Sequence, residues 1–182
     1  NKYINKNKSA YSMAFFTFSE IFDIIVMTVV VGYIFSDLFK RPAAEDYDPL
    51  THFKAGFDIE NLKFAAMVTA PAIIFHELGH KFVALGFGLE AQFQAAWLFL
   101  GLALIMRMMN FGFIFIVPAY VSILGQVAPL ELGLIAFAGP AVNLILWLFA
   151  AFALKKNLFP RKYDTILALT SKINMFLFIF NM

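Results

Sequence analysis

Cysteine is absent from this 182-residue chain. Its absence excludes disulfides, thiolate metal ligands and cysteine nucleophiles, so any metal must be bound by His, Asp or Glu side chains. Charged residues are also scarce, at 14%, and the net charge of +2 is scattered rather than gathered into a basic run with aromatic residues. A nucleic-acid-binding surface is therefore not expected.

Apolar residues are as abundant as charged residues are scarce. The chain is 62% hydrophobic, contains 24 phenylalanines and has a mean hydropathy of +0.78, which lies well outside the range of soluble globular proteins. In water such a chain would expose a large apolar surface and aggregate. We therefore expect an all-α, polytopic integral membrane protein surrounded by a lipid bilayer, with residues 1–182 forming a single membrane-embedded domain.

Four apolar segments are long enough to be membrane-spanning helices. They cover about residues 10–36, 63–85, 132–154 and 164 onward. Residues 40–62, between the first two segments, are polar and rich in Pro, Asp and Glu, which predicts an extramembrane loop.

Residues 89–130 are not expected to contain a further span. The two apolar runs in this region, 97–109 and 111–124, are each too short, because about 13 helical residues rise only roughly 20 Å against a hydrocarbon core of about 30 Å. Asn110 and Pro118 interrupt the pattern. The region therefore predicts a re-entrant hairpin packed against the protein, where irregular backbone is tolerated.

A short strand is expected within this region, because residues 91–95 read Ala-Gln-Phe-Gln-Ala and alternate with the period of a strand. An exposed edge of this strand could bind another extended peptide segment by β-addition.

Residues 76–80, in the second span, read His-Glu-Leu-Gly-His. His76 and His80 are four residues apart, so on a helix they project from one face and can bind one tetrahedral zinc. Zinc makes a bound water acidic enough to lose its proton near neutral pH. Glu77 is offset by one residue, outside the ligand set but near enough to take that proton as the water attacks a peptide carbonyl. The segment predicts His76 and His80 as metal ligands and Glu77 as the catalytic base.

Chance is a weak explanation for this segment. A random chain of this length contains the pattern with a probability of roughly 1%, and ionisable residues inside an apolar span are rare because their insertion costs several kcal/mol. The alternative is that both histidines are neutral and hydrogen-bonded within the helix bundle. A third metal ligand is not obvious, because His52, Glu131 and Asp164 all lie outside the spans or at their ends.

With these motifs in place, the chain resembles the site-2 protease family of intramembrane zinc metalloproteases, most closely its archaeal members. Residues 76–84 are similar to the zinc helix of that family, and residues 138–143, Ala-Gly-Pro-Ala-Val-Asn, are similar to the Ala-Gly-Pro-x-x-Asn that opens its next core helix. Residues 173–182 resemble the segment that leads into Asn-x-x-Pro and Leu-Asp-Gly. The resemblance covers roughly residues 63–182.

This resemblance implies a zinc metalloendopeptidase that cuts membrane-anchored substrates within or near their transmembrane segments, with its active site nearer the cytosolic side. The aspartate of Leu-Asp-Gly is the third zinc ligand in the family, and we expect it beyond Met182, the chain being a truncated fragment. Asn143 and Asn181 are candidate substrate-binding residues. For Asn143, a hydrogen bond between helices is an equal alternative. The sequence does not indicate an oligomeric state.

Two other functions remain open: a non-catalytic pseudo-protease that binds membrane clients, and a membrane metal-binding or transport protein. Transport requires a relay of ionisable residues along several spans. Glu20 and Asp23 could line a polar path to the metal, although a polar contact between helices is the more usual role.

The metal also constrains the topology. A ligand beyond Met182 can meet His76 and His80 only if the last span ends on the side where the second span ends. This favours the hairpin and places the basic residues 155–162 opposite the N-terminus, whereas the positive-inside rule favours the same side.

Overall fold

The computed structural model describes residues 16–40, 58–111 and 117–182. Four of its helices are long and apolar enough to cross a membrane, the last of them together with the short 3-10 helix η1 (Arg161–Tyr163) that precedes it. They are α1 (Phe18–Phe35), α2 (Ile59–Gly86), α4 (Pro129–Lys155) and α5 (Asp164–Phe180). The predicted fold class, an all-α polytopic membrane protein with about four spanning helices, is confirmed.

Three helices begin at residues other than those expected: α4 begins at Pro129 rather than about residue 132, and side chains cap the starts of α1 and α2. In α1, the Thr17 hydroxyl accepts a hydrogen bond from the Glu20 N–H, and the Glu20 carboxylate accepts one from the Thr17 N–H. This capping box starts the helix at Phe18 rather than near residue 10; residues 10–15 lie outside the described part. In α2, the Asp58 carboxylate caps the first turn, so residues 59–62 of the predicted loop are helical.

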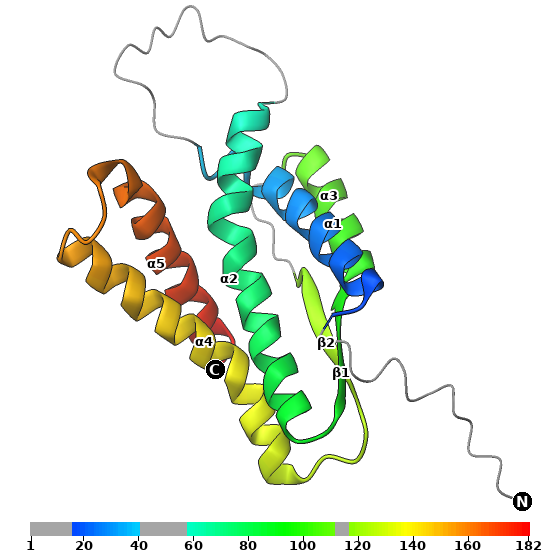
Figure 1. Cartoon of the computed structure of the whole chain (residues 1–182). Helices are drawn as coiled ribbons and strands as arrows, with labels where there is room; N and C mark the ends of the chain where they lie inside the picture. The colour runs from blue at the N-terminus through cyan, green and yellow to red at the C-terminus, as the bar shows by residue number, and fades with distance from the viewer. Residues whose placement is uncertain (1–15, 41–57, 112–116) are drawn as a thin grey trace, which may run out of the picture.

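The central helix is α2, which packs against α1 on one side and α4 on the other (Figure 1). Small residues permit both approaches. A Cβ on Gly32 would lie 2.7 Å from Cβ of Ala66, and a Cβ on Gly79 would lie 2.9 Å from the carbonyl oxygen of Ala138. Because lipid tails are as apolar as the helices, close packing of this kind is what associates helices in a bilayer.

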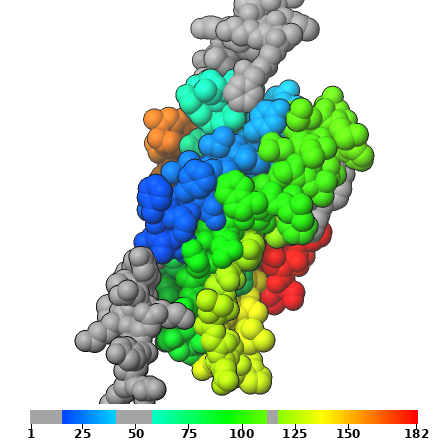
Figure 2. All heavy atoms as spheres, turned by 90° about the vertical axis from the view of Figure 1, so that its right-hand side faces the viewer, coloured from blue at the N-terminus to red at the C-terminus, as the bar shows by residue number. Residues whose placement is uncertain are grey.

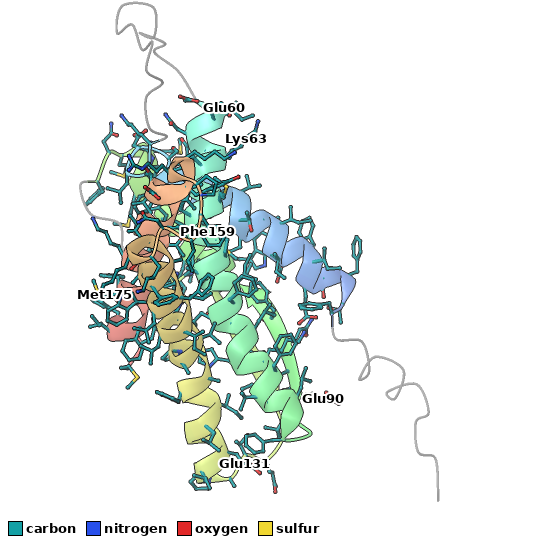
Figure 3. All side chains as sticks on the ribbon, turned by 60° about the vertical axis from the view of Figure 1, so that its left-hand side comes forward. Glu60, Lys63, Glu90, Glu131, Phe159 and Met175 are labelled. Atoms are coloured by element: carbon teal, nitrogen blue, oxygen red, sulfur yellow. The ribbon has the colours of Figure 1, made fainter. Side chains whose placement is uncertain are left out.

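The two ends of the bundle are marked by charged residues. Glu60 and Lys63 lie at the start of α2, whereas Glu90 and Glu131 lie at the opposite end (Figure 3). The loop between α4 and α5 lies at the same end as the start of α2, and α1 begins toward the other end (Figure 1). This is the arrangement that closure around a metal predicts.

Between α2 and α4 the chain forms β1 (Glu90–Ala95), α3 (Trp97–Met108) and β2 (Ala119–Leu124). The strands are antiparallel with Glu90 opposite Leu124, so the segment returns to the level at which it began, as the predicted hairpin requires. With 12 residues, α3 rises only about 18 Å, too little to span a bilayer. The sequence predicted β1 but not its partner.

α3 lies beside α1 on one face of the molecule (Figure 2). Phe22 stacks on Trp97 with ring centroids 6.2 Å apart. Arg107 of α3 forms an ion pair with Asp37. Buried residues of α1, α3 and both strands form a small core between these elements: Met27, Val31, Phe93, Ala95, Leu100 and Ala119.

Two carboxylates of α1 bind α2 and β1. Glu20 forms an ion pair with Lys81, and the two side chains are 1% and 2% exposed. Glu20 also accepts a hydrogen bond from the Phe93 N–H at 2.7 Å, and Asp23 accepts one from the Ala95 N–H at 2.9 Å. These additional bonds help to offset the desolvation of the buried pair. Glu20 and Asp23 therefore join helices α1 and α2 to the strand β1, which is the more usual role of such residues.

Candidate metal centre

Helix α2 brings the two predicted metal ligands together. Nε2 of His76 lies 3.1 Å from Nε2 of His80, and the rings are nearly perpendicular, at 80°. Two nitrogens that bind one tetrahedral zinc at 2.0–2.1 Å are roughly 3.3 Å apart. The separation of the two Nε2 atoms is therefore close to the one that a shared zinc requires.

Hydrogen bonding shows which nitrogen of His80 carries the proton. Nδ1 of His80 lies 2.7 Å from the carbonyl oxygen of Ile135, and a carbonyl oxygen can only accept. Nδ1 must therefore donate, which leaves Nε2 of the neutral ring with a free lone pair.

The same result follows for His76 from its partner Asn143. The Asn143 amide nitrogen donates to the carbonyl oxygen of Ala72 at 3.1 Å and to Oδ1 of Asn174 at 2.7 Å. The Asn143 oxygen therefore faces His76 and accepts from its Nδ1. When both rings are neutral, two unprotonated Nε2 atoms thus point at each other, an arrangement that is repulsive alone and favourable around a cation.

Gly139 of α4 keeps the point where these nitrogens converge open. A Cβ at this position would lie 2.3 Å from Nε2 of His80 and 2.7 Å from Nε2 of His76, far inside van der Waals contact. The free lone pairs and this open space together fit a zinc ion held by His76 and His80.

Glu77 and the histidines face one cavity of about 330 Å³. Glu77 is 9% exposed. The cavity is lined by residues of α2, β2 and α4 and by the residue that follows α5: His76, Glu77, His80, Tyr120, Val121, Ile123, Leu132, Ile135, Ala136 and Asn181. The predicted base is therefore beside the predicted ligands, within a largely apolar wall.

The two candidate substrate-binding asparagines lie in different places. Asn181 lines the cavity, as a residue that contacts substrate must. Asn143 is 0% exposed and lies behind His76, so its contacts are those of the alternative, a hydrogen bond between helices. Asn174, also 0% exposed, was not singled out as a site residue. The feature that could have identified it is a polar amide side chain within an apolar span.

A third ligand is not found in the described part of the chain, where no group of three His, Cys, Asp or Glu is placed to hold a metal. Glu131 accepts a hydrogen bond from the Ala128 N–H at the start of α4, and Asp164 opens α5 at the far end of that helix. His52 lies outside the described residues. The aspartate that the resemblance places after Met182 stays a prediction.

Two curated proteins are similar to this chain, and both carry the name "Putative zinc metalloprotease". The one from Methanocaldococcus jannaschii is 31% identical over 137 residues, which are 74% of this chain and 62% of that protein. The one from Synechocystis sp. is 30% identical over 117 residues, which are 64% of this chain and 26% of that protein. The chain thus spans less than two thirds of the length of either relative. No family model and no solved structure matches it.

Proposed function

We propose that this protein is an intramembrane zinc metalloendopeptidase of the site-2 protease type, which hydrolyses peptide bonds in or near the transmembrane segments of membrane-anchored substrates. The observation that carries the proposal is the convergence of two unprotonated imidazole nitrogens, 3.1 Å apart, in the cavity that Glu77 lines. The names of the two relatives support zinc and peptide hydrolysis.

The depth of the site supports an intramembrane substrate. His76 lies ten residues before Gly86, the last residue of α2, which is about 15 Å along the helix axis. The helix around it is apolar enough to cross a membrane. This depth favours a substrate whose scissile bond lies in a segment that itself enters the bilayer.

Each side chain of the site has a chemical role in this proposal. His76 and His80 hold the zinc, with the aspartate of Leu-Asp-Gly as the proposed third ligand. Zinc supplies a Lewis acid that polarises the peptide carbonyl and acidifies water. Glu77 takes a proton from the attacking water and delivers it to the departing amine. Leu132 and Ile135 contribute apolar side chains to the wall of the cavity.

Cleavage requires an extended peptide, and the strand edge first expected to hold it is occupied. The N–H groups of Phe93 and Ala95 point to α1, where Glu20 and Asp23 accept them. In an antiparallel ladder the alternate residues then bond to the partner strand, and the N–H of Ala96 does donate to the carbonyl oxygen of Pro118. The N–H groups of Phe93 and Ala95 are therefore bonded to α1, which argues against substrate pairing at this edge of β1.

The outer edge of β2 is the one that can accept a substrate strand. Val121 lies opposite Phe93, whose N–H points away from β2 to Glu20, so Val121 likewise directs its backbone groups away from β1. Val121 also lines the cavity beside Glu77. In the proposed function, an extended substrate segment pairs with β2 at this edge and presents its carbonyl to the zinc.

Proline at Val121 tests this edge. Val121→Pro removes an N–H that the β1–β2 ladder does not use, so the sheet should persist while one hydrogen bond to substrate is lost. We expect about a tenfold slower initial rate of cleavage of a membrane-anchored reporter. Val121→Thr keeps the N–H and the branched shape and should cleave at the wild-type rate. Equal rates for the two variants would contradict pairing at β2.

Removal of zinc tests the proposed function as a whole. The intact protein, purified in detergent, should contain stoichiometric zinc and cleave a reporter that carries a transmembrane segment. A chelator should abolish cleavage, and added zinc should restore it, because the two histidines alone cannot polarise a peptide carbonyl. Cleavage that persists without metal would refute the proposal. Retained zinc with reporter binding but no cleavage would instead identify a pseudo-protease, and zinc flux across vesicles would identify a transporter.

A further inference from the structure

We propose that Asn174 and Asn143 form a positioning relay, which we call the asparagine relay, that holds His76 in the form able to bind metal. This inference rests on the proposed function, because it assigns the relay to the same metal centre. Asn174 lies in α5, Asn143 in α4 and His76 in α2, so the relay connects three spanning helices. Both asparagines are 0% exposed.

The relay begins at a backbone group that fixes its direction. The Asn174 amide nitrogen donates to the carbonyl oxygen of Thr170 at 2.8 Å, and that oxygen can only accept. The Asn174 oxygen must then face Asn143, whose amide nitrogen donates to it at 2.7 Å. A second carbonyl oxygen, that of Ala72, accepts from the same Asn143 nitrogen at 3.1 Å.

The direction of the relay decides the tautomer of His76. With its nitrogen committed to two acceptors, Asn143 can present only its oxygen to Nδ1 of His76, so the ring proton resides on Nδ1 and Nε2 is free. A reversed Asn143 amide would donate to Nδ1 and move the proton to Nε2, directly opposite Nε2 of His80. That tautomer cannot bind zinc through Nε2.

If the two asparagines had a purely structural role, different substitutions would be tolerated at their positions. Polar side chains commonly join helices in a bilayer, and for that purpose it does not matter which atom donates. The relay requires an oxygen acceptor at position 143 and a second oxygen acceptor at position 174. Substitutions that keep the acceptor and remove the donor therefore separate the two roles.

The test compares aspartate and leucine at each position of the intact protein. Asn143→Asp keeps an acceptor for the Nδ1–H of His76, as carboxylates do beside many zinc-bound histidines, whereas Asn143→Leu has none. Asn174→Asp and Asn174→Leu make the same comparison one step away. The matched control is Thr69→Val, because Thr69 is a buried polar residue of α2 whose hydroxyl donates to the carbonyl oxygen of Ala65 in the same helix.

Two measurements are made on each variant: the zinc dissociation constant, by competition with a chromophoric chelator, and the ¹⁵N spectrum of labelled histidine in the metal-free protein. The chain has only three histidines, so His76 can be assigned. We expect Asn143→Leu to bind zinc about 10- to 100-fold more weakly and to show His76 partly protonated at Nε2. Asn174→Leu, which leaves Ala72 as an acceptor, should show about a tenfold loss.

The aspartate variants should bind zinc more tightly than the corresponding leucine variants, and Thr69→Val should match wild type. Wild-type affinity and an unchanged His76 spectrum in both leucine variants would overturn the relay. Equal losses for aspartate and leucine would also overturn it and leave a structural role. If Asn143→Leu does not fold, the Asn174 pair decides. If the wild-type protein binds no zinc, the proposed function fails, while the metal-free spectra still decide the relay.

Discussion

Glu77→Gln should abolish cleavage while zinc stays bound. Glutamine has the size of glutamate but cannot accept a proton, and the Nε2 atoms of His76 and His80 are untouched by the change. General-base catalysis contributes roughly 10²- to 10⁴-fold, so we expect a loss of that order in the rate of reporter cleavage. Zinc content and cleavage should be measured on the same preparation.

The matched control for this variant is Glu60→Gln. Glu60 lies on the same helix as Glu77 but at its first turn, where it is exposed and pairs with Lys63, far from the cavity. It should leave both zinc content and cleavage unchanged. Undiminished cleavage by Glu77→Gln would refute Glu77 as the base. Loss of zinc together with cleavage would assign Glu77 to the metal ligands instead.

Gly139→Ala should remove zinc binding itself. The added methyl group would lie 2.3 Å and 2.7 Å from the two Nε2 atoms, so the imidazoles could no longer converge on one ion. Loss of a supporting residue costs about 10- to 100-fold in metal affinity, and we expect displacement of both ligands to exceed about 100-fold. The zinc dissociation constant measures this effect directly.

Gly133→Ala is the control for this substitution. Gly133 is on the same helix, and a Cβ there meets nothing within 4 Å. Alanine is a better helix former than glycine by about 1 kcal/mol, so neither variant should weaken α4, and Gly133→Ala should bind zinc normally. Wild-type zinc affinity in Gly139→Ala would show that the two Nε2 atoms do not form the metal site.

Local features of this protein follow from the sequence because each depends on a few neighbouring residues. The four spans are recognisable from length and apolarity alone, since the thickness of a bilayer sets the length of a helix. The projection of His76 and His80 from one face needs only the period of the helix. The exceptions are the helix starts, where the caps at Thr17 and Asp58 are stronger signals than the apolar periodicity.

The sequence by itself therefore determined an apolar helical protein with a zinc-binding pattern inside a span. Tertiary structure decided the rest: that Asn143 and Asn174 connect to His76, that Gly139 leaves room at the convergence of the nitrogens, and that two N–H groups of β1 bond to carboxylates of α1. These contacts join residues far apart in the chain, such as His76 and Asn143. The physical reason is that helices in lipid associate through small residues and single polar groups, whose partners no hydropathy pattern specifies.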